Sequence, residues 1–307
     1  MVHGLNIAGR DDAIQPFNLG RLHLGGRLVR LGPALDRILS QHDYPEAISR
    51  VLGELITITV VLGAGLKFEG RMTAETRGDG PVHLLVADYT SDGDVRAYAG
   101  FDRQRLGSGV SPLSGLVGKG VLVMTVDQGS KSDIYQSVVE LGGSDLADCM
   151  RGFFRQSDQI DTALEVAVQR HAGCWRSGAI ALQRIAELGP GDEPVTMAER
   201  QDAWNTTMVL LSSVTGGELT DPFLTSRDLL YRLFHDIGVR VHEPRDVRFA
   251  CSCSHTRALT MLRRLPAESI DEYVVDGEIE VVCKFCNRRQ TFTPGDVTQP
   301  PASTLNR

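Results

Sequence analysis

The sequence predicts an α+β protein made of an N-terminal α/β core domain with antiparallel-rich sheets, a helical linker region and a small cysteine-bearing C-terminal domain. Residues 67–101 alternate apolar and polar side chains between turn clusters, which is typical of antiparallel strands. Residues 196–237 carry apolar side chains at helical spacing, and four of the six cysteines fall in two short segments near the C-terminus. The expected boundaries are 1–188 for the core, 189–247 for the linker, 248–295 for the cysteine-bearing domain and 296–307 for a mobile polar tail.

The core domain is expected to open with a strand and a buried helix. Residues 20–31, "GRLHLGGRLVRL", carry apolar residues, the β-branched Val29 and glycines, and predict the strand. The helix follows "DYPE", where Asp43 stands three residues before Glu46 as in a capping box. Its continuation, "VLGELITITVVLGAGL", contains a β-branched run typical of a strand, but its length and its cap favour a buried helix.

Strands and one further helix are expected over the rest of the core. The turn clusters "GDGP" and "SDGD" separate strands between Lys67 and Phe101. Two more strand pairs are predicted, "GVLVMTVDQG" with "YQSVVELGG" and "LEVAVQRH" with "AIALQRI". Between them, "SDLADCMRGFFRQSD" predicts an amphipathic helix capped by Ser144. The segment "GPGDEP" at 189–194 predicts the end of the domain.

The linker region predicts amphipathic helices that need a surface to cover. One apolar stripe consists of Trp204, Met208 and Leu211 at i, i+4 and i+7. A second stripe follows a Ser226 cap and consists of Leu229, Leu230, Leu233 and Phe234. Two helices cannot bury such faces against each other alone, so we expect them to pack on the preceding domain.

Composition limits the classes of function. The hydrophobic content of 42% and charged content of 23% are ordinary for a folded protein, and the net charge of −7 argues against general nucleic-acid binding. The N-terminus lacks the apolar core of a signal peptide, and the longest uncharged run, Leu55 to Leu66, is too short to span a membrane. We therefore expect a cytoplasmic protein without a membrane partner. In that reducing compartment, paired cysteines are more typical of metal sites or redox switches than of permanent disulfides.

The four clustered cysteines predict a zinc site. Their spacing is Cys251-x-Cys253, then 29 residues, then Cys283-x-x-Cys286. A Cys-x-x-Cys turn presents two thiolates to one tetrahedral zinc ion, and Cys-x-Cys can supply two more if the backbone bends between them. Asn287 stands where such a turn often needs a left-handed residue, which asparagine tolerates. Four thiolates fill the coordination sphere, so no position remains for a catalytic water.

This site makes the C-terminal domain metal-dependent and sensitive to oxidation. A segment of about 45 residues rarely buries enough apolar surface to fold alone, and structural zinc contributes on the order of 10–16 kcal/mol in small domains. We therefore expect the domain to fold with zinc and unfold without it. Oxidation removes the ligands: Cys283 and Cys286 can pair directly, whereas a bridge between Cys251 and Cys253 requires backbone distortion. Either bridge closes a very small loop and restores little constraint.

Other readings of the cysteines and nearby residues carry less weight. The four cysteines could be unrelated structural residues, and His255 could replace one ligand, although a histidine at a helix start fits its position better. Cys149 lies in an amphipathic helix and fits a small buried hydrophobe. Cys174 lies near a loop close to His171, but no companion acid supports a nucleophile there.

Two rival functions follow from the same region. A zinc ribbon could bind nucleic acid through a basic face formed by Arg263, Arg264, Arg288 and Arg289. A thiol–disulfide oxidoreductase could use Cys283 and Cys286, although the thioredoxin-like strand and helix are missing around "CKFC". Nucleotide and hydrolase motifs are also missing, since "GLVGKG" lacks the first glycine and the final Ser or Thr of a phosphate loop, and neither G-x-S-x-G nor H-E-x-x-H occurs.

Over residues 17–293 the chain resembles the redox-regulated bacterial heat-shock chaperones of the 33 kDa chaperonin family. The spacing of the four cysteines is close to diagnostic. The matching stretches are "GRLVRL", "HDYPEAISRVLGEL", "LKFEGRMTAETRGDGPVHLLVADYTSDGDVRA", "MTVDQG", "LADCMRGFFRQSDQIDTAL", "RLFHDIGVRVHEPRDVRFACSCS" and "DGEIEVVCKFCNRR". The chain departs from the family where it has "IYQS" at 134–137 in place of "RYQG", and Asn287 in place of glycine.

The resemblance implies an ATP-independent holdase that is not an enzyme and has no catalytic residues. Its reduced form would hold one Zn²⁺ per chain through Cys251, Cys253, Cys283 and Cys286 and would be inactive. Oxidants would convert these residues into the disulfides Cys251–Cys253 and Cys283–Cys286 and release zinc. The C-terminal redox-switch domain and the linker would then loosen, expose apolar surface to unfolding client proteins, and allow homodimerisation. The missing phosphate loop agrees with ATP independence.

Overall fold

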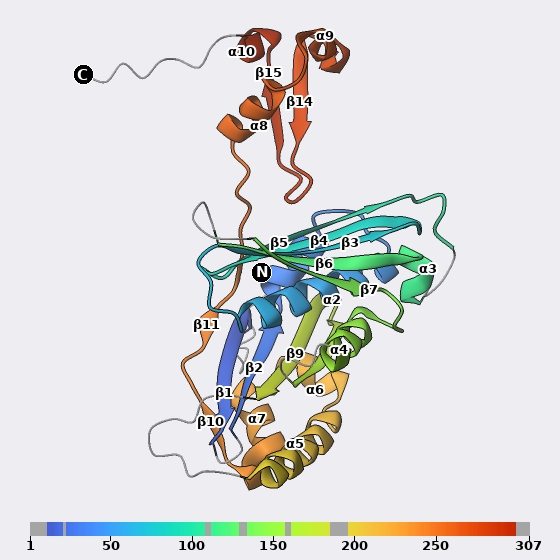
Figure 1. Cartoon of the computed structure of the whole chain (residues 1–307). Helices are drawn as coiled ribbons and strands as arrows, with labels where there is room; N and C mark the ends of the chain where they lie inside the picture. The colour runs from blue at the N-terminus through green and yellow to red at the C-terminus, as the bar shows by residue number, and fades with distance from the viewer. Residues whose placement is uncertain are drawn as a thin grey trace, which may run out of the picture. The chain divides into compact units, whose positions relative to one another are not determined.

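The computed structural model describes residues 11–20, 23–107, 112–128, 134–156, 161–184 and 196–298, and it divides into two compact units, Met1–Ala250 and Cys251–Arg307 (Figure 1). The first unit contains two large sheets with helices, and the second contains a small sheet with short helices. The predicted α+β fold is confirmed. The helices of the linker region belong to the first unit.

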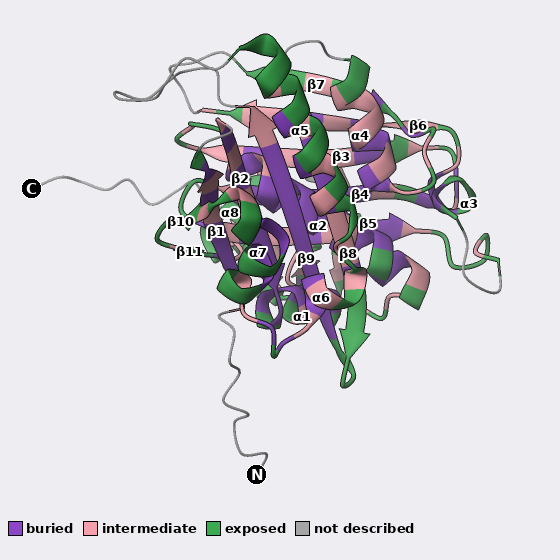
Figure 2. Ribbon diagram, turned by 90° about the horizontal axis from the view of Figure 1, so that it is seen from below, coloured by how far each residue is buried: buried purple, intermediate pink, exposed green. Residues whose placement is uncertain are grey.

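The first sheet joins strands from the beginning of the first unit with strands from its later part. Its strand order is β10-β1-β2-β9-β8, and all pairs are antiparallel. Eight consecutive residues of β9 are buried, so this central strand is covered on both faces (Figure 2). The strands are β1 (Ala13–Leu19), β2 (Leu24–Leu31), β8 (Thr162–His171), β9 (Cys174–Arg184) and β10 (Val239–Val241), with β11 (Arg245–Asp246) also paired to β1.

The second sheet has the order β12-β5-β4-β3-β6-β7, and only the β12–β5 pair is parallel. The turns "GDGP" and "SDGD" join consecutive antiparallel strands as predicted, and the predicted pair β6–β7 is also present. The strands are β3 (Arg71–Gly78), β4 (Val82–Thr90), β5 (Asp94–Phe101), β6 (Gly120–Asp127), β7 (Tyr135–Glu140) and β12 (Arg248–Phe249).

Helix α2 (Glu46–Gly63) lies between the two sheets and contacts strands of both (Figure 1). Its β-branched run is therefore helical, as its length predicted, because apolar surface surrounds it on every side. The hydroxyls of Thr57 and Thr59 donate to the carbonyls of Gly53 and Leu55, 2.6 Å away in each case, which satisfies these polar groups inside the core. Three shorter helices complete this layer: α1 (Pro33–Leu39), α3 (Leu113–Val117) and α4 (Leu146–Gln156).

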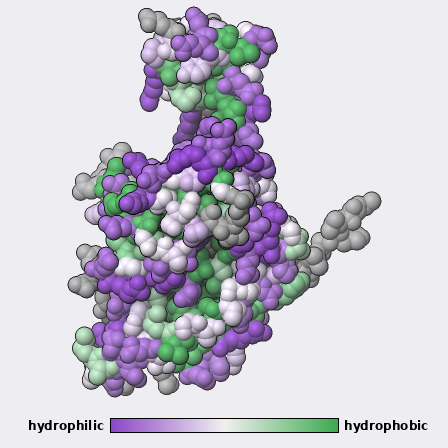
Figure 3. Space-filling model, turned by 90° about the vertical axis from the view of Figure 1, so that its right-hand side faces the viewer, coloured by the Kyte–Doolittle hydropathy of each residue, from purple (hydrophilic) through white to green (hydrophobic). Residues whose placement is uncertain are grey.

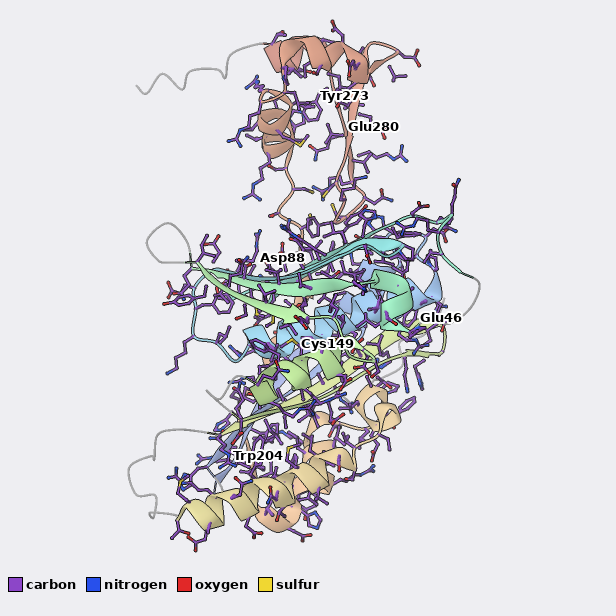
Figure 4. The ribbon with its side chains drawn as sticks, turned by 45° about the vertical axis from the view of Figure 1, so that its right-hand side comes forward. Glu46, Asp88, Cys149, Trp204, Tyr273 and Glu280 are labelled. Carbon is purple, nitrogen blue, oxygen red and sulfur yellow. The ribbon has the colours of Figure 1, made fainter. Side chains whose placement is uncertain are left out.

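The linker helices cover the opposite face of the first sheet, as expected from their apolar stripes. They are α5 (Met197–Ser212), α6 (Gly216–Thr220) and α7 (Ser226–Phe234). Phe234 is fully buried and stacks on Phe17 of β1 with ring centroids 5.8 Å apart. Trp204 points from α5 toward the sheet and lies under the guanidinium of Arg184 (Figure 4). The buried residues of this interface are Phe17, Leu19, Leu24, Leu28, Ala163, Ile180, Leu182, Leu211, Leu219, Leu224, Leu229, Leu230, Leu233 and Phe234.

The three predicted helix caps were wrong. Helix α2 has Pro45 at its N-cap with no side-chain cap bond, and Asp43 forms an ion pair with Arg103 instead. At the start of α4 the cap is Asp145, the residue after Ser144. Its carboxylate accepts the N–H of Asp148 at 2.7 Å. Thr225, next to Ser226, caps α7.

The second unit is a three-stranded antiparallel sheet with short helices around a small core. Its buried apolar side chains are Leu262, Ile270, Ile279, Phe292 and Val297. Since Val297 belongs to α10, the folded part extends beyond the expected boundary at 295, and the remainder of the expected tail and the "GPGDEP" segment lie outside the described residues. The elements are α8 (His255–Leu262), α9 (Ala267–Ile270), a 3-10 turn (Asp271–Tyr273), β13 (Val274–Val275), β14 (Glu278–Val282), β15 (Arg289–Phe292) and α10 (Pro294–Thr298).

The surface has the mixed character of a folded globular protein. Hydrophobic and hydrophilic side chains are interspersed on the face shown in Figure 3. Among the described residues, no helix is both long enough and apolar enough to cross a membrane.

Candidate metal centre

The structure brings the four clustered cysteines together within the second unit. The sulfur atoms of Cys251, Cys253, Cys283 and Cys286 all lie within 4.8 Å of one another. The first two come from the segment that precedes α8, and the other two come from the turn between β14 and β15. Residues 32 positions apart in the chain thus meet at one point, with Sγ of Cys251 lying 3.7 Å from Sγ of Cys283.

The turn between β14 and β15 positions Cys283 and Cys286. The N–H of Cys283 donates to the carbonyl of Arg288 at 2.9 Å, and the N–H of Asn287 donates to the carbonyl of Cys283 at 2.8 Å. Asn287 has φ of +53°, so the predicted left-handed residue is confirmed. These bonds reverse the chain tightly enough to direct both thiols to the same side.

The start of α8 positions the other pair. The side chain of Ser254 accepts the N–H of Arg257 at 3.2 Å and caps the helix directly after Cys253. The guanidinium of Arg257 donates to the carbonyl of Ser252 at 2.8 Å, which supports the bend between the two cysteines. This cap was not predicted, although a serine before a helical pattern is a usual signal for one.

His255 lies outside the thiol cluster. It is the first residue of α8 and its ring lies 4.5 Å from that of Phe292, centroid to centroid. The interpretation of His255 as a helix-start residue is therefore confirmed.

The arrangement of the four sulfur atoms fits a tetrahedral zinc ion. A Zn–S bond of about 2.3 Å implies sulfur atoms about 3.8 Å apart in an ideal tetrahedron. The sulfur atoms of Cys251 and Cys283 are 3.7 Å apart, and those of Cys253 and Cys286 are 3.3 Å apart. An all-thiol donor set also suits zinc better than calcium or magnesium, which prefer oxygen. That these residues bind zinc stays a prediction.

The thiols differ in how easily they ionise without a cation. Burial opposes ionisation of Cys283, but hydrogen bonds from the N–H groups of Cys286 and Phe285, together with those from the thiols of Cys286 and Cys251, lower its pKa to about 7. Burial raises the pKa of Cys253, and hydrogen bonds with the neighbouring sulfur atoms raise it further. Burial also raises the pKa of Cys286. At neutral pH, Cys283 is therefore the thiol best prepared to become a thiolate.

The remaining cysteines are separate from this cluster. Cys149 is buried on α4, accepts the N–H of Gly143 at 3.3 Å, and has its pKa raised by burial (Figure 4). The interpretation of Cys149 as a buried hydrophobe is confirmed. Cys174 is exposed opposite His171 at the β8–β9 hairpin, and the ring of His171 faces Phe223.

The setting of Cys283 and Cys286 differs from that of a thioredoxin-like redox motif. Their turn joins two antiparallel strands, whereas reactive Cys-x-x-Cys thiols commonly lie at a helix N-terminus. Two of the four arginines considered for a basic face have partners within the second unit. Arg289 forms an ion pair with Glu280 at 3.0 Å, and Arg263 donates to the carbonyl of Asp296.

Three comparisons relate the chain to known proteins. The family model described as Hsp33 protein matches residues 12–293. A 33 kDa chaperonin from Caulobacter vibrioides is 37% identical over 294 residues, covering 92% of this chain and 95% of that protein. A 33 kDa chaperonin from Pseudomonas fluorescens is 33% identical and covers 94% and 93% of the two chains. The crystal structure of the Hsp33 homologue from Thermotoga maritima has the same fold, with a TM-score of 0.76, 22% identity and coverage of 94% and 97%.

Proposed function

The chain belongs to the Hsp33 family, and from this membership we propose that it is a redox-regulated, ATP-independent holdase chaperone. The observation that carries the proposal is the cluster of four thiols in a unit whose core contains only a handful of buried apolar side chains. A unit this small depends on its cross-link for stability. Whatever removes the cross-link therefore unfolds the unit.

In the reduced state, one zinc ion holds the second unit together. Cys251, Cys253, Cys283 and Cys286 are the proposed ligands, and a bound zinc ion would supply the cross-link between α8 and the β14–β15 turn. The coordination sphere is then full, so the proposed zinc has a structural role and leaves no position for a catalytic water.

Oxidation removes the cross-link. We assign the disulfides to Cys251–Cys253 and Cys283–Cys286. Each bridge takes two electrons from two thiols, and one hydrogen peroxide accepts them and becomes two waters, so two peroxides are consumed per chain. Disulfide sulfur is a poor zinc ligand, so Zn²⁺ leaves, and neither bridge ties α8 to the β14–β15 turn.

The loss of structure then reaches the linker helices along the chain. Three short strands, β10, β11 and β12, lie between α7 and Cys251, and each is only two or three residues long. They pair at the edges of the two sheets, with β1 or with β5. Such short edge strands fray easily. Unfolding that begins after Ala250 can therefore propagate back along the chain to α7.

Release of α5 and α7 from the first sheet supplies the surface for clients. It would uncover apolar side chains that include Phe17, Leu28, Ile180 and Phe234. Apolar surface of this kind binds the exposed hydrophobic segments of unfolding proteins without chemical energy, and it also favours homodimerisation of the active form. We place the protein in the cytoplasm, where the thiols stay reduced until oxidative stress.

The test measures zinc release and chaperone activity in the same samples. Peroxide at mildly elevated temperature should release about one zinc per chain and should allow the protein to suppress aggregation of a denatured client without ATP. A Cys174→Ser variant is the matched control, because it removes the exposed thiol outside the cluster and should behave as the wild type. Full suppression by the reduced, zinc-loaded protein would refute the gating.

The nucleic-acid alternative is less well supported. Two of its four proposed arginines, Arg263 and Arg289, already have acceptors within the second unit, and the chain carries a net charge of −7. It predicts RNA or DNA binding that weakens steeply with salt.

A further inference from the structure

A cavity of about 460 Å³ lies in the first unit, in the layer between the two sheets. Met72 of β3 and Met124 of β6 form part of the wall on one side, and Arg27 of β2 and Gln183 of β9 form part of the opposite wall. In the second sheet, Met124 pairs with Ala74 on β3 and with Ser137 on β7, so these three side chains share one face of the sheet. Met124 and Ser137 line the cavity, which identifies this face as the one turned toward the interior. The volume is that of an ordinary small-molecule site.

Helix ends close the cavity on two further sides. Leu62, Leu66 and Phe68 come from the end of α2 and the residues that follow it, and Phe153 and Phe154 come from the end of α4. The rings of Phe153 and Phe154 meet edge to face, with centroids 5.7 Å apart. The described ends of α2 and α4 thus both contribute apolar side chains to the cavity wall.

One end of the cavity is positively charged. Arg27 donates to the side-chain oxygen of Gln183 at 3.2 Å and to the carbonyl of Gly65 at 3.3 Å. A second guanidinium, that of Arg245, donates to the carbonyl of Ala64 at 2.8 Å. Burial lowers the pKa of Arg27, and the like charge of Arg245 lowers it further. Two positive charges thus lie close together beside the end of α2.

The end of α2 does not neutralise these two charges. Arginines often cap the last carbonyls of a helix, and this role accounts for the bonds to Ala64 and Gly65. A helix C-terminus carries the equivalent of about half a negative charge, which is less than two guanidiniums supply. None of the described residues that line the cavity is acidic, and Lys67 at its rim adds a further positive charge. Glu69 borders only an adjoining hollow.

We propose that this cavity binds a small amphipathic anion, specifically an unbranched hydrocarbon chain that ends in one carboxylate. The carboxylate pairs with the guanidinium of Arg27, and the chain lies among Met72, Met124 and the two phenylalanines of α4. Methionine and aromatic side chains adapt to a flexible apolar chain, and arginine prefers a carboxylate to a neutral head group. The site belongs wholly to the first unit and does not depend on the proposed chaperone activity.

The ligand test is an isothermal titration of the reduced, zinc-loaded full-length protein with dodecanoate below its micelle concentration. We expect saturable binding of one dodecanoate per chain and roughly tenfold weaker binding of decanoate, the ratio for two buried methylene groups. Dodecanol and dodecylammonium should each bind at least about tenfold more weakly, because neither forms the charge-assisted bond to Arg27. Equal affinity for dodecylammonium, or heat without saturation, would overturn the proposal.

Two variants locate the site. Arg27→Gln should weaken dodecanoate about tenfold or more, whereas Arg240→Gln, which removes an exposed arginine of β10, should leave affinity unchanged. Ser137→Phe places a ring in the cavity from β7 without touching Arg27, and it should also abolish tight binding. If circular dichroism shows that Arg27→Gln is unfolded, the binding of dodecanoate to Ser137→Phe and the comparison of head groups test the proposal instead. Wild-type affinity in a folded Ser137→Phe variant would refute the location.

Discussion

Glu54 is a buried acid whose ionisation should control the stability of the first unit. It lies on α2, and its carboxylate accepts the N–H of Ala147 at 2.8 Å, at the start of α4. Burial raises its pKa to about 7, and the negative charge of Asp145 also raises it, while the bond from Ala147 acts in the opposite direction. The side chain thus joins two helices and titrates near neutral pH.

The pKa shift of Glu54 determines the size and the sign of its contribution to the free energy of unfolding. A rise from the model-compound value of 4.5 to about 7 corresponds to about 3 kcal/mol at about 1.36 kcal/mol per pKa unit. Because the pKa is higher in the folded state, the stabilisation is fully present below pH 4.5 and is lost as pH rises through 7. Glu54 keeps some contact with solvent, so this value is an upper limit.

Glu54→Gln should therefore be more stable than the wild type at pH 8, by up to about 3 kcal/mol, and the difference should fall below about 1 kcal/mol at pH 5. The amide oxygen can still accept from Ala147, while the ionisable group is gone. The assay is urea unfolding followed by tryptophan fluorescence, which reports only on the first unit because both tryptophans, Trp175 and Trp204, lie there.

A control separates Glu54 from general charge effects. Glu140→Gln removes an exposed acid of β7 and should show no such pH dependence. Asp145 and Arg151 interact with Glu54, and Arg151 also forms ion pairs with Asp148 and Glu165. If the difference between Glu54→Gln and the wild type is the same at pH 5 and pH 8, the reasoning is refuted.

Three further predictions concern the linker interface and the metal centre. Phe234→Ala should destabilise the first unit by about 3–5 kcal/mol in the same urea assay, because it leaves a cavity beside Phe17, and a loss below 1 kcal/mol would show that the α7 interface is loose. Asn287→Val should lower zinc affinity about tenfold in a competition titration, since a β-branched residue tolerates a left-handed φ poorly, whereas Asn287→Gly should bind as the wild type does. Chelation at neutral pH should make the second unit protease-sensitive, and unchanged resistance would contradict its dependence on a metal.

The periodic elements were predictable because burial dictates their pattern. Alternation located the strands of the second sheet, and the stripes of α5 and α7 correctly predicted that these helices cover the core. Helix α2 has the most ambiguous sequence, since "ITITVV" favours a strand by local propensity. A helix surrounded by apolar surface tolerates β-branched residues, because packing in the core outweighs a propensity difference of a few tenths of a kcal/mol per residue.

The caps were less predictable because neighbouring residues compete for the same role. Ser144 and Asp145 are both good cap residues, as are Thr225 and Ser226, and only the exact start of the helix selects between them. The thiol cluster was more predictable. A Cys-x-x-Cys turn positions two thiols by local geometry alone, so the sequence specified the turn and its left-handed Asn287.

The buried polar sites could not be predicted, since their partners are set by the packing of distant elements. Glu54 meets Ala147 across 93 residues, and Arg27 meets Gln183 across 156. In the sequence, Glu54 is one acid within an apolar helix and Arg27 is one of three arginines near β2. Each acquires its property only when the two sheets enclose the layer that contains α2 and α4: a proton held near neutrality for Glu54, and an uncompensated charge beside a cavity for Arg27. Both sites therefore depend on the fold of the first unit, whose helix α2 and strand β2 carry the two residues.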